Sequence, residues 1–144
     1  GETTVLHYLE VLRDRIGFEE LAKKVVNPLK GRKIGAYYGC LLLRPSKVMA
    51  FDNAEDPTIL EDFIRALGAE PVIYPYRNEC CGGYISIKEP EKATALCDKI
   101  TDSAKSFEAA RISISFRDRG RSIFVKEIDS QPVIAKSAAA AISA

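Results

Sequence analysis

Strand-like and helix-like segments alternate along most of this chain of 144 residues, and that alternation limits the folds it can adopt. Short apolar or alternating runs predict strands over residues 33–38, 71–74, 111–116 and 123–128. Helical periodicity and end signals predict helices over residues 56–68, from about 90 to 107, and 133–143. The order strand, helix, strand, helix, strand is typical of a parallel sheet with crossover helices. We therefore predict an α/β fold, a three-layer-like domain with a mostly parallel sheet. Asp56 and Pro57 are expected to cap and open the helix over 56–68.

Two shorter helical segments precede the first strand. The first, over residues 5–16, has apolar residues at the helical period and Thr3 or Thr4 available as its cap. The second begins at Phe18 and is ended by Asn27 and Pro28. We expect a helical arm over residues 1–30 and a cysteine-rich α/β unit over residues 31–144, which together form a piece of a larger subunit. His7, the only histidine, is interpreted as structural.

The charge balance excludes several function classes. The chain has 21 basic and 20 acidic residues, a formal net charge of +1, which gives no electrostatic reason to expect nucleic acid or an anionic membrane as the main partner. The longest apolar runs, 48–51 and 138–142, are too short to span a bilayer. The first residues show no signal-peptide pattern. We therefore predict a soluble, cytoplasmic protein with no transmembrane segment.

Three of the four cysteines follow the ends of predicted strands. Cys40 comes just after the first strand, and Cys80 and Cys81 follow the second. Because sites in open α/β sheets gather beyond the carboxyl ends of the strands, we expect these three sulfurs at the same edge of the sheet. In a reducing compartment, cysteines are more often ligands, redox groups or core residues than disulfides.

Glycines flank these cysteines and are expected to shape the site. Gly39, Gly82 and Gly83 permit unusual backbone angles and the close approach of a bulky group. Thiolates bind soft metals and iron–sulfur clusters. Successive side chains diverge, so Cys80 and Cys81 cannot both chelate one ion comfortably, although they could hold different irons of one extended cluster. The alternative is that all three are small buried apolar side chains.

The fourth cysteine lies in the helix that starts near Pro90. Its apolar stripe comprises Ala93, Leu96, Cys97, Ile100, Ala104 and Phe107. Cys97 is therefore interpreted as a core residue, and a ligand role is the less favoured alternative. Tyr37, Tyr38 and Tyr84 could line the cysteine site, although we expect at least two of them to pack in the core.

Two stretches of the chain carry a family resemblance: GRKIGAYYGCLLLRP over residues 31–45 and FDNAEDPTILEDFIRALGAEPVIYPYRNECCGG over residues 51–83. They resemble the second, C-terminal cysteine-rich domain (CCG domain) of the heterodisulfide reductase B subunit. The pattern of that family is a cysteine, then Cys-Cys-Gly several tens of residues later, then Cys-x-x-Cys. Cys40, Cys80 and Cys81 match its first three cysteines. The resemblance begins in the preceding helices and runs to about Phe107, roughly three quarters of the chain.

The resemblance implies an oxidoreductase subunit that handles thiols and disulfides through a non-cubane 4Fe–4S iron–sulfur cluster. Cys40, Cys80 and Cys81 would be cluster ligands, and the partners would be iron–sulfur electron-transfer subunits and a small thiol or disulfide substrate. Some relatives hold zinc in one such domain. We expect this chain to be inactive alone. The alternative is a non-catalytic docking or structural domain that binds zinc or no metal.

The end of the family pattern is missing from this sequence. Where relatives carry Cys-x-x-Cys, this chain has Phe116 to Arg119, and no cysteine follows Cys97. Because clusters are held by a full set of thiolates, we expect the chain to fold but to hold no intact cluster after aerobic handling.

Overall fold

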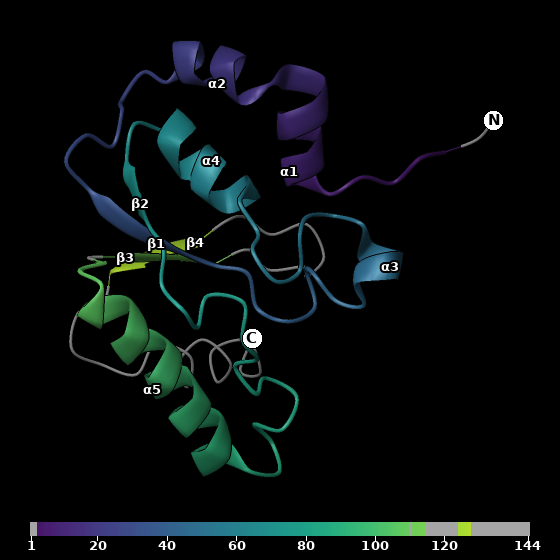
Figure 1. The fold of residues 1–144 in the computed structure, drawn as a ribbon, viewed down its shortest axis with the longest axis vertical. Helices are drawn as coiled ribbons and strands as arrows, with labels where there is room; N and C mark the ends of the chain where they lie inside the picture. Colours follow the sequence, from purple (N-terminus) through teal and green to yellow (C-terminus); the bar gives the residue numbers. More distant parts are fainter. Residues whose placement is uncertain (1–2, 110, 115–123, 128–144) are drawn as a thin grey trace, which may run out of the picture.

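The computed structural model describes residues 3–109, 111–114 and 124–127. Its sheet has four strands in the order β2-β1-β3-β4. Their bounds are Lys33–Tyr37 for β1, Glu70–Val72 for β2, Arg111–Ile114 for β3 and Phe124–Glu127 for β4. β1 pairs in parallel with both β2 and β3, and β4 runs antiparallel to β3. The prediction of an α/β fold with a mostly parallel sheet is confirmed (Figure 1).

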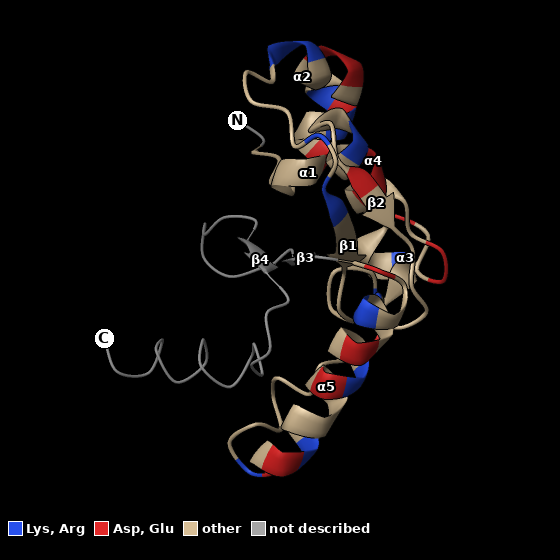
Figure 2. Ribbon diagram, turned by 90° about the vertical axis from the view of Figure 1, so that its left-hand side faces the viewer, with Lys and Arg blue, Asp and Glu red and all other residues tan. Residues whose placement is uncertain are grey.

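Helices cover both sides of the sheet. They are α1 (Tyr8–Glu10), the π-helical turn η1 (Val11–Ile16), α2 (Phe18–Lys24), α3 (Ser46–Met49), α4 (Ile59–Ala66) and α5 (Pro90–Ser106). Figure 1 shows α1, α2 and α4 on one side of the sheet and α5 on the other. Figure 2 shows both signs of charge along α2, α4 and α5. Among the described residues, no helix is long and apolar enough to cross a membrane.

The side chains of β1 serve two separate cores. Ile34 and Ala36, with Tyr38 just after the strand, lie in a buried cluster with residues of α4. Tyr37, on the opposite face of the strand, lies in a second cluster with Ile100 of α5. Because successive side chains of a strand point to opposite faces, one short strand joins the two helical layers.

The N-terminal helices pack on the first of these cores. Leu9 and Leu12 are buried in the same cluster as the β1 residues. The expected threonine cap is wrong, because His7 caps α1: its Nδ1 accepts from the Leu9 N–H at 3.2 Å. The carboxylate of Glu10 accepts from the His7 N–H at 2.7 Å, which completes a capping box. The structural interpretation of His7 is confirmed, and the division of the chain at residue 30 stays a prediction.

The start of α4 also differs from the expectation. Asp52 replaces Asp56 as the capping carboxylate, since its Oδ2 accepts from the backbone N–H groups of Thr58 and Ile59, each at 2.8 Å. Asp56 instead pairs with Arg77. Asp52 therefore reaches across the loop and satisfies two backbone N–H groups at the start of α4.

The predicted buried stripe of α5 is confirmed at four positions and wrong at two. Ala93, Cys97, Ile100 and Ala104 are buried, whereas Leu96 and Phe107 are 38% and 50% exposed. The loop over 117–121 and the helix predicted over 133–143 lie outside the described residues.

Close packing between β1 and the second core depends on Gly35. A Cβ at this position would lie 2.9 Å from Cε1 of Tyr74, which is almost fully buried, and 3.4 Å from Cβ of Ala109. We predict that Gly35→Ala lowers the free energy of unfolding by about 1–3 kcal/mol through overpacking, measured by urea denaturation. The penalty should shrink in a Tyr74→Leu background, where the ring is gone. An equal penalty in both backgrounds would show that the contact with Tyr74 is not the cause.

Candidate functional site: a cysteine-bearing edge of the sheet

The site begins where the chain leaves β1. Gly39 follows with a left-handed φ of +65°, a conformation that favours glycine. Cys40 comes next and is half-buried. Its carbonyl accepts from the Arg44 N–H at 3.0 Å, which closes a turn. Cys40 is therefore held at the carboxyl end of β1, as the sequence predicted.

The chain after β2 reaches the same edge, because β1 and β2 are parallel. Two contacts fasten this loop to the end of β1. The Tyr38 N–H donates to the Arg77 carbonyl at 2.8 Å, and the Tyr37 hydroxyl donates to the Glu79 carbonyl at 2.9 Å. The next residue is Cys80, so the fastened segment delivers a second thiol to this edge.

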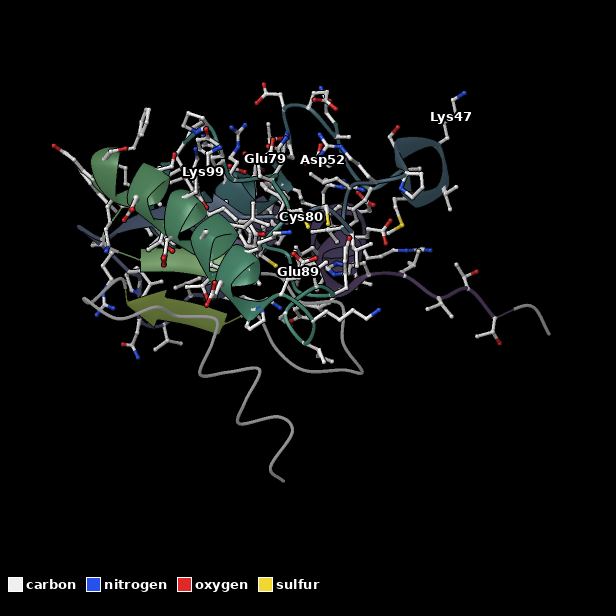
Figure 3. All side chains as sticks on the ribbon, turned by 90° about the horizontal axis from the view of Figure 1, so that it is seen from below. Lys47, Asp52, Glu79, Cys80, Glu89 and Lys99 are labelled. Atoms are coloured by element: carbon white, nitrogen blue, oxygen red, sulfur yellow. The ribbon has the colours of Figure 1, made fainter. Side chains whose placement is uncertain are left out.

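The Cys80 thiol lies near the Cys40 thiol. Figure 3 labels Cys80, with sulfur atoms drawn in yellow beside it. Burial raises the pKa of the Cys80 thiol, and the contact with Cys40 raises it further. The Gly82 N–H, which donates to Cys80 Sγ at 3.3 Å, opposes this rise. The raised pKa favours the thiol form of Cys80 at neutral pH.

Tyr84 faces the two thiols from the solvent side. Its hydroxyl lies 3.5 Å from Cys40 Sγ. The hydrogen bond with Cys40 is the main cause that raises the pKa of Tyr84 to about 12. Tyr37 and Tyr38 are buried, whereas Tyr84 is exposed. The expectation that at least two of the three tyrosines pack in the core is confirmed, and Tyr84 is the one that lines the thiols.

Cys81 lies on the side of the loop that faces the second core. Its side chain packs against the second core cluster. Burial raises the pKa of the Tyr37 hydroxyl, and the Cys81 thiol lies near enough to raise it further. Successive side chains therefore diverge, as expected. The three cysteines share one edge of the sheet, but their thiols face in two directions.

Cys97 lies beneath Cys81 in the core. It is 6% exposed, and its thiol donates to the Cys81 carbonyl at 3.4 Å. Burial raises its pKa from 9.0 to about 11. The prediction of a buried position on the apolar face of α5 is confirmed.

Gly82 has the most restricted position of the flanking glycines. Its φ is +74°, and an added Cβ would lie 2.9 Å from Cδ1 of Leu96 and 3.2 Å from Cα of Ala93. Gly82 therefore lets the cysteine loop press against α5. Gly83 has an ordinary φ, and a Cβ there would make an ordinary contact, 3.7 Å from Cys81 Sγ.

The thiols suit an iron–sulfur group in kind, because they are soft donors at an edge with close backbone approach. They fall short of a full ligand set in number. Within the part of the chain that the structure describes, no group of three or more His, Cys, Asp or Glu side chains is arranged to hold a metal ion. Phe116 to Arg119 lie outside the described residues.

Residues 34–115 match the protein family described as CCG, cysteine-rich domain. The chain is 35% identical over 109 residues to the 8-methylmenaquinol:fumarate reductase membrane anchor subunit of Wolinella succinogenes, covering 76% of this chain and 38% of the relative. It is 31% identical over 96 residues to the B subunit of the ferredoxin/F(420)H(2)-dependent CoB-CoM heterodisulfide reductase of Methanosarcina acetivorans, covering 67% and 32%. A protein of Archaeoglobus profundus that is named as like the heterodisulfide reductase B subunit is 33% identical over 109 residues, covering 73% and 36%.

These matches confirm the resemblance drawn from the sequence. The chain spans between about a third and two fifths of the length of these three relatives.

The burial of Cys97 leads to a prediction about stability. Cys97→Ala should lower the free energy of unfolding by about 1 kcal/mol or somewhat more at neutral pH. Because the pKa in the folded protein is raised, the unfolded chain loses this proton first as the pH rises. The contribution of Cys97 to the free energy of unfolding is therefore fully present below pH 9 and is lost as the pH rises toward about 11. Urea denaturation should show the difference between the wild type and Cys97→Ala shrinking over this range.

Two results would contradict this interpretation of Cys97. One is a stability difference that stays constant up to about pH 11. The other is loss of bound metal from a folded Cys97→Ala variant, which would make Cys97 a ligand.

Proposed function

We propose that this chain serves thiol and disulfide redox chemistry at Cys40, Cys80 and Cys81. The premise is that the chain belongs to the CCG cysteine-rich domain family and carries the cysteine-rich domain of the heterodisulfide reductase B subunit. These three residues would be the protein ligands of an iron–sulfur cluster. Gly39, Gly82 and Gly83 would give the ligand loops their shape.

The proximity of Cys40 and Cys80, beside the Tyr84 hydroxyl that lies 3.5 Å from Cys40 Sγ, is the observation that carries this proposal. The two residues lie far apart in the sequence, yet two parallel strands bring their thiols to one edge of the sheet. Core packing alone gives no reason for two half-buried thiols to meet beside an exposed tyrosine hydroxyl. A bound iron–sulfur cluster would carry electrons between a partner and a disulfide.

The chain's own residues would prepare this edge for a ligand. The raised pKa of Cys80 keeps its proton until a metal displaces it, so binding would release protons to solvent. Tyr84 would orient the thiols through its hydroxyl. Cys81 would have to turn from Tyr37 toward the edge to act as a ligand, and the neighbouring Gly82 and Gly83 would allow the turn.

The proposed partners are an iron–sulfur electron-transfer subunit and a small thiol or disulfide. The names of the relatives support this choice, since they are subunits of reductases linked to ferredoxin, F(420)H(2) or a menaquinol. A cytoplasmic location stays a prediction from the sequence.

A second candidate is a docking or structural domain that binds zinc or no metal. The packing of Cys81 against the second core cluster favours the form without metal, because it leaves only Cys40 and Cys80 near each other. Two cysteines alone are fewer than the four ligands of a structural zinc site.

Anaerobic reconstitution with iron and sulfide tests the proposal. We predict that the unmodified chain takes up little iron, and that Phe116→Cys/Arg119→Cys takes up about four irons per chain with visible absorption, since it restores the missing thiolates. Uptake of about four irons by the unmodified chain would show that the ligand count is wrong. No uptake by the double variant, with zinc bound instead, would favour the docking domain.

Single substitutions in that double variant assign the ligands. Cys40→Ser and Cys80→Ser should each abolish iron uptake, because each removes a thiolate. Cys97→Ala is the matched control and should retain uptake, since its thiol faces the core. If Cys40→Ser and Cys97→Ala behave alike, the assignment of Cys40 is wrong.

A further inference from the structure

We infer that the buried pair Glu61 and Arg77 positions the cysteine loop and directs Cys80, in preference to Cys81, toward Cys40. The inference deepens the proposed function and rests on it, because the orientation of Cys80 toward Cys40 matters only if the two thiols act together. The geometry that carries it does not depend on a bound metal.

The pair is buried where α4 meets the cysteine loop. The side chains of Glu61 and Arg77 are 2% and 9% exposed, and Arg77 Nε lies 3.2 Å from Glu61 Oε1. Arg77 Nη2 also donates to Asp56 Oδ1 at 2.5 Å. Burial raises the pKa of Glu61, while Tyr38 and Arg77 lower it. A buried charge needs partners of this kind, since removing one leaves the other uncompensated.

Tyr38 joins this pair to both cysteine segments. Its hydroxyl donates to Glu61 Oε2 and accepts from the Leu60 N–H at 2.9 Å. Its backbone N–H donates to the Arg77 carbonyl at 2.8 Å. Tyr38 precedes Cys40 by two residues, and Arg77 precedes Cys80 by three. Tyr38 on the Cys40 segment and Arg77 on the Cys80 segment are therefore bonded to each other, and both contact Glu61.

The residue after Arg77 is held as well. Asn78 is buried, and its amide donates to the carbonyls of Ala54 and Glu55 at 3.1 and 3.3 Å. Its own carbonyl accepts from Arg44 Nη1 at 3.3 Å. The Glu79 carbonyl, which accepts from the Tyr37 hydroxyl at 2.9 Å, holds the next residue. With Arg77, Asn78 and Glu79 all held, the backbone that leads into the cysteine pair is fixed, and so are the directions in which Cys80 and Cys81 leave it.

Cross-linking of the metal-free protein with dibromobimane, a short reagent that joins two thiols, tests the inference. Mass spectrometry with fragmentation shows whether Cys40 is linked to Cys80 or to Cys81. The wild type should link Cys40 mainly to Cys80. In Arg77→Gln and in Glu61→Gln/Arg77→Gln this preference should fall about tenfold or more, because small displacements of a positioned group have effects of that size. The double variant leaves no lone buried charge, so it tests the inference if Arg77→Gln does not fold.

Matched controls lie on the exposed face of α4. Asp62→Asn and Arg65→Gln make the same charge changes in an exposed pair and should keep the wild-type preference for Cys80. Circular dichroism establishes that each variant is folded. The inference is overturned if the folded double variant keeps the wild-type preference, or if the wild type itself shows none. If Phe116→Cys/Arg119→Cys takes up no iron while the metal-free wild type keeps its preference for Cys80, the proposed function alone is rejected.

Discussion

The backbone hydrogen bond from Tyr38 to the Arg77 carbonyl is the contact on which the cysteine edge depends. It ties the end of β1 to the loop after β2, and the buried contacts of Tyr38 and Arg77 with Glu61 reinforce it. A parallel sheet brings two chain ends to the same edge but does not fix the loops beyond them. In this protein, that role falls to a polar cluster inside the first core.

The two cores divide the work of supporting this edge. The cluster on the α4 side holds Tyr38 and, through it, the Cys40 segment. The cluster on the α5 side holds Tyr37 and receives Cys81. Gly82 then brings the loop against α5 at a distance that a larger residue would prevent. The adjacent cysteines are therefore divided, since Cys81 packs against the second core and Cys80 lies near Cys40 and the Tyr84 hydroxyl.

The sequence was sufficient for the alternation of strands and helices and for placing Cys40, Cys80 and Cys81 at one edge of the sheet, but it did not predict α3. Alternation of strands and helices predicted the sheet, and strand order predicted that Cys40 and Cys80 would meet. The cap of α4 could not be predicted, because Asp52 reaches it across a loop, whereas local rules favoured Asp56. Leu96 and Phe107 continue an apolar period on α5 yet remain exposed, since helical periodicity predicts which face is buried but not how wide that face is.

The polar cluster of Tyr38, Glu61 and Arg77 was also beyond sequence reasoning, because the burial of Glu61 and Arg77 depends on tertiary contacts with Tyr38 and Asp56. Most charged loop residues face water, so the position of Arg77 before the cysteine pair is a weak signal without a structure.

A crystal structure of the protein grown without oxygen, with the sulfur positions located by anomalous scattering, tests the central claim most directly. The account predicts that Cys40 and Cys80 are adjacent at the carboxyl ends of β1 and β2, with the Tyr84 hydroxyl beside them and Cys81 directed toward Tyr37. Ordered loops that hold Cys40 and Cys80 apart, or that direct Cys81 toward Cys40 in place of Cys80, would contradict it.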